Sequence, residues 1–82
     1  MTENVREQIL RFLDKRGGRA PLISIKRNFF YDTSAEEFFE VIRDMKEKGL
    51  IEVRPYGEFD VLNVFLTKYS LSVLRALDEL KN

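Results

Sequence analysis

The chain has 82 residues with 14 Lys or Arg and 14 Asp or Glu, so its formal net charge is zero. It contains no cysteine and no histidine, which excludes disulfides, most zinc sites, haem ligation, and Ser-His or Cys-His nucleophilic catalysis. No apolar run approaches the roughly 20 residues of a membrane span and no signal-peptide pattern is present, so we expect one small cytoplasmic domain.

The first helix is expected over about residues 3–16. Val5, Ile9, Phe12 and Leu13 repeat at helical spacing, which predicts one apolar face. Thr2 is the expected N-cap, with Glu3 in the first turn, and Gly17-Gly18 is the expected stop. This helix also carries four basic residues, and the simpler interpretation is that they form a solvent-exposed face. They are Arg6, Arg11, Lys15 and Arg16.

A minimal strand and a second helix are expected next. Arg19 to Leu22 is short and contains Pro21, which suits a sheet edge, and we expect it to pair with a later hairpin. Ser24 is the expected cap of a helix over about residues 24–30. Leu22, Ile25 and Phe29 would face inward, with Lys26, Arg27 and Asn28 facing out.

The third helix is expected over about residues 34–48. Two registers of a capping box are possible, Ser34 with Glu37 or Thr33 with Glu36. Gly49 suits the left-handed position after a helix end. The predicted buried stripe consists of Ala35, Phe38, Phe39, Ile42 and Met45.

A two-stranded hairpin is expected over about residues 50–67. Ile51 and Val53 alternate with polar residues, as in a half-buried strand, and Val64 and Leu66 return on the same face. Because proline donates no ladder hydrogen bond, we expect the strand to open at Pro55 and a tight turn to follow at Gly57-Glu58.

The last helix is expected over about residues 70–81, and its apolar content is high for a terminal helix. One face should dock on the domain. The width of the apolar stripe predicts that a second face, on Leu71 to Leu80, forms a homodimer, although the helix could simply close a small core.

Two segments resemble winged-helix transcription regulators. Val41-Ile42-Arg43-Asp44-Met45-Lys46-Glu47-Lys48-Gly49-Leu50-Ile51-Glu52 resembles the end of their third helix and their first wing strand. Phe65-Leu66-Thr67 before a leucine-rich helix is similar to the ending of the multiple-antibiotic-resistance and PadR types, although Ser70 stands where those families often have glycine. The resemblance implies a single α+β domain over residues 1–82, a winged helix-turn-helix with a three-helix core, a short first strand, a wing hairpin and an additional C-terminal helix.

In DNA-binding members of this fold the third helix enters the major groove and the wing contacts the backbone or the minor groove. The resemblance therefore implies contacts to double-stranded DNA from the second helix, from both ends of the third helix and from the wing. The candidate residues are Lys26, Arg27, Asn28, Thr33, Ser34, Arg43, Lys46, Arg54 and Tyr56.

The charge pattern of the third helix differs from that of a helix that binds in the major groove of DNA. Residues 1–31 hold seven Lys or Arg and three Asp or Glu, whereas residues 32–50 hold three and six. The outward face of the third helix carries five acids and one base, which phosphate would repel. We therefore expect any DNA contacts to lie nearer Thr33, Ser34, Arg54 and Tyr56 than the helix middle.

Three functions fit parts of these observations. The first is a small transcription regulator that binds DNA as a dimer on a pseudo-palindromic site. The alternative is a protein–protein interaction module that uses the acidic third helix and the wing without DNA. The third is an enzyme or divalent-metal site on the clustered carboxylates. Because a convex helix surface lacks the concavity that catalysis needs, we expect no enzyme, no catalytic residue, no cofactor, no metal and no small-molecule ligand.

Overall fold

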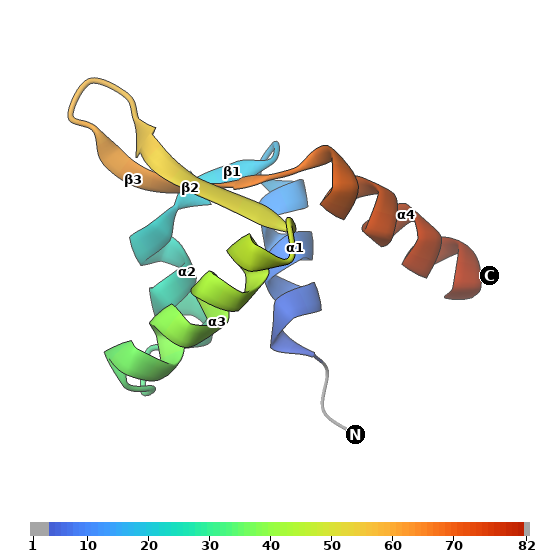
Figure 1. The fold of residues 1–82 in the computed structure, drawn as a ribbon, viewed down its shortest axis with the longest axis horizontal. Coiled ribbons are helices and arrows are strands. Elements are labelled where there is room, and N and C mark those ends of the chain that lie inside the picture. Colours follow the sequence, from blue (N-terminus) through green and yellow to red (C-terminus); the bar gives the residue numbers. More distant parts are fainter. Residues whose placement is uncertain (1–3, 82) are drawn as a thin grey trace.

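The computed structural model describes residues 4–81. Its elements follow in the order α1 (Val5–Lys15), β1 (Arg19–Pro21), α2 (Leu22–Phe29), α3 (Ala35–Glu47), β2 (Ile51–Tyr56), β3 (Val61–Leu66) and α4 (Lys68–Lys81). The strands form one antiparallel sheet in the order β1-β3-β2, with α1, α2 and α3 on one side of it (Figure 1). This is the α+β, winged-helix-like architecture that the sequence predicts, with β2 and β3 as the wing.

The core lies between the inner face of the sheet and the three helices. Each helix contributes residues about one turn apart, because the apolar positions recur with the helical period. The buried apolar side chains are Ile9, Leu10, Leu13, Ala20, Ile25, Phe30, Phe38, Ile42, Met45, Ile51, Val64 and Leu74.

The buried stripe of α3 is narrower than predicted. Phe38, Ile42 and Met45 are buried, but Ala35 is exposed and Phe39 keeps 48% of its surface exposed. Successive residues in a helix are turned by about 100°, so Phe39 cannot share the direction of Phe38. Phe39 instead lines two cavities between α3 and the wing.

The starts of α1 and α2 also differ from the prediction. Asn4 caps α1, since its side chain accepts a hydrogen bond from the Arg6 N–H at 2.8 Å, whereas Thr2 lies outside the described residues. Helix α2 begins at Leu22 rather than at residue 24, so Ser24 lies inside it and is not its cap. Pro21 ends β1 with a φ of −59°, which leads the chain directly into the helix.

Helix α3 starts and ends on local signals. The Ser34 hydroxyl accepts from the Glu37 N–H at 3.2 Å, which selects the Ser34 register of the capping box. Gly49 has a φ of +76°, and the Leu50 N–H donates to the Met45 carbonyl at 2.9 Å. This left-handed glycine turns the chain from α3 into β2.

The wing lies within the predicted range, but β2 stays paired at Pro55 and the turn is wider than predicted. Strand β2 continues through Pro55 to Tyr56, and residues 57–60 form a four-residue loop instead of a tight turn at Gly57-Glu58. Strand β2 is the outer strand of the sheet, and an edge position tolerates the missing N–H of Pro55. The hairpin therefore projects beyond α2 and α3 (Figure 1).

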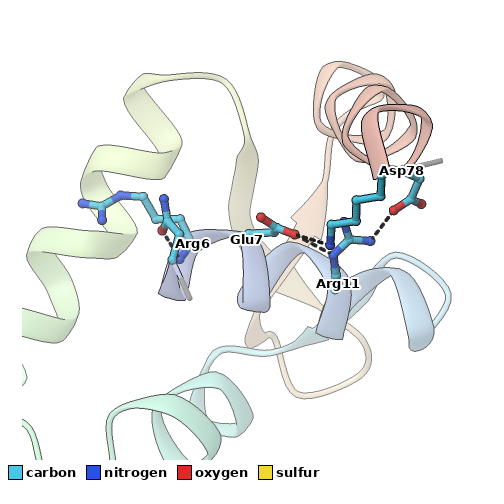
Figure 2. Close-up of polar contacts among 6 residues, drawn as sticks. Arg6, Glu7, Arg11 and Asp78 are labelled. Carbon is cyan, nitrogen blue, oxygen red and sulfur yellow. Dashed lines mark hydrogen bonds and ion pairs between the residues drawn. The ribbon is translucent and has the colours of Figure 1, made fainter. Parts of the chain in front are cut away.

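Helix α4 begins at Lys68, two residues before the expected start, and docks on α1. Leu74 is buried between them, and Arg11 lies between Glu7 Oε2 at 2.9 Å and Asp78 Oδ1 at 3.0 Å (Figure 2). Its hydrogen bond with Glu7, together with Asp78, raises the pKa of the Arg11 guanidinium. Within residues 4–81, no helix has the length and apolarity needed to cross a bilayer.

Candidate nucleic-acid interface

The solvent side of α3 is divided into two flanks of opposite charge. At about 100° per residue, Glu37 and Asp44 project on the side of α1, whereas Phe39, Arg43 and Lys46 project on the side of the wing. Glu36, Glu40 and Glu47 form the outward edge between them. The acids that the sequence assigns to one face are thus separated from the bases.

Asp44 is engaged by cations from two directions. Its Oδ2 lies 2.9 Å from Arg6 Nε of α1 and 3.2 Å from Lys48 Nζ. The hydrogen bond from Arg6, with a further one from Lys48, holds the pKa of Asp44 below its ordinary value. The Glu37 carboxylate accepts from the Ser34 hydroxyl at 3.4 Å, so on the solvent side of α3 only the outward edge keeps free carboxylates. Among residues 4–81, no three carboxylates lie close enough together to hold a metal ion.

Four cations remain uncommitted on the side of α2 and α3 that adjoins the wing. We call Lys26, Arg27, Arg43 and Lys46 the basic rim. Within the described part of the chain none of them forms an ion pair, although Lys26 Nζ donates to the Phe30 carbonyl at 3.4 Å. Arg27 follows Ile23 by one helical turn and is exposed beside it. The structure therefore gathers four of the nine predicted DNA-binding residues.

An apolar hollow lies between the basic rim and the wing. It consists of two adjoining cavities of about 290 and 320 Å³, which share Leu22, Phe39 and Leu62. Arg43 and Lys46 line one cavity and Lys26 the other. We call this hollow the wing groove, and its apolar walls are Leu22, Ile23, Phe38, Phe39, Ile42, Val53, Val61 and Leu62. The sequence analysis did not predict this groove. Its signal in the sequence is two pairs of adjacent apolar residues, Leu22-Ile23 and Val61-Leu62, since one buried face cannot cover both members of such a pair.

Three predicted residues lie away from the basic rim. Asn28 Nδ2 donates to the Ser24 carbonyl at 2.7 Å, on another side of α2. Thr33 is half-buried in the turn, where its N–H donates to the Phe30 carbonyl at 3.1 Å. The Ser34 hydroxyl is occupied by the helix cap, and Glu36 and Glu37 place two carboxylates in the first turn. A phosphate approaching the start of α3 would meet these carboxylates.

Arg54 and Tyr56 lie on the opposite face of the sheet from the wing groove. Successive strand residues point to opposite faces, so Val53 faces α3 and Arg54 faces away. The Arg54 guanidinium lies 3.8 Å from the centre of the Phe65 ring, and the Arg19 guanidinium lies 4.0 Å from that of Tyr56. These cation–aromatic contacts form a layer of their own, separate from the basic rim.

Asn63 lies on the same face of the sheet as Arg54, its cross-strand partner. Asn63 is only 3% exposed, and both ends of its amide are paired: Arg19 Nη1 donates to its Oδ1 at 3.2 Å and its Nδ2 donates to the Val61 carbonyl at 2.9 Å. The wing tip exposes Glu58, Phe59 and Asp60, so it is acidic where a DNA-contacting wing is usually basic.

Comparisons of the chain with protein-family models, with curated proteins and with solved structures found no match.

Proposed function

We propose that this chain is a DNA-binding winged-helix protein, a small cytoplasmic transcription regulator of the multiple-antibiotic-resistance or PadR type that acts as a dimer. The basic rim carries the proposal. It brings four exposed or half-exposed cations from α2 and α3 to one side of the molecule, without carboxylate partners among residues 4–81. Such a set is suited to phosphate contacts on both sides of a groove.

The charge division of α3 specifies how the helix would approach DNA. Glu36, Glu40 and Glu47 would be repelled by phosphates if the outward edge entered the major groove first. Rotation of the helix toward its wing-side flank places Arg43 and Lys46 against the duplex instead. In this orientation Lys26 and Arg27 contact the backbone next to α3.

A second copy of the chain is the proposed partner of α4. Opposite Leu74, the helix exposes an apolar stripe at spacings of four, three and four residues, and Tyr69 and Leu80 in it are 59% and 83% exposed. The stripe consists of Tyr69, Val73, Ala76 and Leu80. Such spacing suits helix-to-helix packing across a two-fold axis. The two basic rims would then need to lie about one DNA turn apart, ~34 Å.

DNA titrations at several salt concentrations test this function. The wild type, the Lys26→Ala/Arg27→Ala variant and the Arg43→Ala/Lys46→Ala variant are compared by fluorescence anisotropy with duplex DNA. Each lost phosphate contact should reduce the slope of log affinity against log salt by about 0.9, hence by about 1.8 for each double variant. Lys15→Ala/Arg75→Ala is the matched control, because it removes two exposed cations outside the basic rim. Equal slopes in all four proteins would refute the proposal, as would no binding at low salt.

The second candidate is a protein-interaction module that binds a basic partner through the outward edge of α3 and the wing. The exposed Tyr31 and Phe59, at 77% and 83%, favour it, because aromatic side chains are common anchors at interfaces. The same titration separates the two functions, since this module would not bind duplex DNA at low salt.

A further inference from the structure

We propose that the wing groove binds a short amphipathic helix with acidic flanks, presented by another protein. The proposal goes beyond DNA binding, because a phosphate backbone has no apolar surface to fill such a groove. Ile23, Phe39 and Leu62 keep 51%, 48% and 48% of their surfaces exposed, and they adjoin one another around the two cavities. Clustered apolar exposure of this kind marks a binding surface more often than scattered single residues do.

The charges around the wing groove specify the polarity of the occupant. Lys26, Arg43 and Lys46 line it, and none of its lining residues is acidic. None of these three cations has a carboxylate partner in the described part of the chain. An apolar segment flanked by Asp or Glu would bury the groove and pair with the cations, whereas a basic segment would be repelled.

The length of the wing groove suits a helix. Its lining runs along α3 from Phe38 to Lys46, a rise of roughly 10–12 Å. Anchors at positions i, i+3 or i+4, and i+7 of a bound helix cover the same distance on one face. The combined hollow of the two adjoining cavities offers room for the anchor side chains.

Binding in the wing groove would exclude DNA. Three of the four basic-rim residues line the groove, so an acidic helix would occupy the cations proposed to contact phosphate. This consequence rests on the proposed DNA-binding function, whereas the groove interaction itself does not. A partner of this kind would release the protein from its DNA site.

Three synthetic peptides of about 14 residues test the groove interaction. The first has leucines at helical spacing with glutamates between them, the second has the same composition in scrambled order, and the third replaces the glutamates with lysines. Binding is followed by the anisotropy of labelled peptide and by NMR chemical-shift mapping on the full chain. We expect only the first peptide to bind, with shifts centred on Phe39 and Leu62.

The variants separate this interaction from DNA binding. Phe39→Ala removes an anchor contact but no charge, and we expect peptide binding to weaken at least about tenfold while the salt slope of DNA binding stays unchanged. Phe59→Ala, at the exposed wing tip, is the matched control and should bind the peptide as the wild type does. Circular dichroism melts of both variants check that the fold is retained.

Equal binding of the acidic and scrambled peptides would overturn the proposal, as would tighter binding of the basic peptide or unchanged binding in Phe39→Ala. If the acidic peptide binds but the chain does not bind DNA, the groove interaction stands and the DNA-binding function fails. If both bind, excess peptide should displace labelled duplex. Displacement that persists in Phe39→Ala would show that the glutamates alone cause it and would exclude the groove as the site.

Discussion

The junction between β3 and α4 depends on Ser70, which is fully buried. The Ser70 Oγ accepts from the Thr67 N–H at 3.0 Å, and the Thr67 Oγ1 accepts from the Ser70 N–H at 3.1 Å. The two residues thus form a reciprocal cap at the start of α4. Thr67 Oγ1 also donates to the Gly49 carbonyl at 2.6 Å, which ties this cap to the end of α3. Ser70→Ala should therefore destabilise the domain.

The magnitude follows from the bonds that the substitution removes. The Thr67 carbonyl keeps a partner in the Leu71 N–H at 3.1 Å, but the Thr67 N–H loses its acceptor. The lost cap and the unpaired, part-buried Thr67 N–H are the same hydrogen bond, so together they cost about 2 kcal/mol, while the better helix propensity of alanine offsets roughly 0.5 kcal/mol. We expect a net loss of about 1–2 kcal/mol. At about 4–8 °C per kcal/mol for a domain of this size, Tm should fall by roughly 5–15 °C.

Thermal and urea unfolding measure this loss. Ser72→Ala is the matched control, because Ser72 is exposed on the same helix, and it should change the free energy of unfolding by less than about 0.5 kcal/mol. A double-mutant cycle with Thr67→Ala should give less than the sum of the single losses, since the two residues share their bonds. Ser70→Ala and Ser72→Ala proteins of equal stability would refute the cap.

Three further predictions concern α3. Phe38→Ala should cost about 3–5 kcal/mol in urea unfolding, because Phe38 is 1% exposed, whereas the half-exposed Phe39→Ala should cost clearly less; equal losses would contradict the assigned faces. Gly49→Ala should cost about 1–2 kcal/mol at a φ of +76°, with Gly49→Asn nearer the wild type in thermal melts; no difference between the two would contradict the left-handed turn. Asp44→Asn should lower stability at neutral pH. Because the native pKa of Asp44 is depressed, its contribution is fully present above its ordinary pKa and is lost as the pH falls through the lower native value. The gap between wild type and variant should therefore close in acid, and a gap that is constant with pH would contradict the ion pairs.

Features decided by a few consecutive residues could be predicted from the sequence. Gly17 and Gly18 both have positive φ and end α1, and Gly49 does the same for α3. The pairing of β1 with the hairpin also followed from the pattern, and the structure shows that β3 is the strand it joins. Even here the sequence left two capping registers open, and only the structure distinguishes Ser34 from Thr33.

Features that depend on the relative placement of elements could not be predicted. Arg6 and Asp44 are 38 residues apart, so no local pattern pairs them. Strand β2 accommodates Pro55 because β2 is the outer strand of the sheet, and its place in the sheet cannot be recognised from neighbouring residues alone. The separation of Arg54 and Tyr56 from the basic rim follows from strand alternation, but only once the face toward α3 is known.

Helix α3 is acidic overall, but its charges are divided between the side of α1 and the side of the wing, where their surroundings differ. Arg6 and Lys48 engage Asp44 on the side of α1, Glu37 belongs to the cap, and Arg43 and Lys46 stand apart on the side of the wing. A net charge of zero therefore does not imply an electrostatically uniform surface. The remaining outward carboxylates would resist deep insertion into a major groove while leaving the basic rim free. A protein built this way would bind DNA through few phosphate contacts, with modest affinity, so that an acidic segment in the wing groove needs only comparable affinity to displace it.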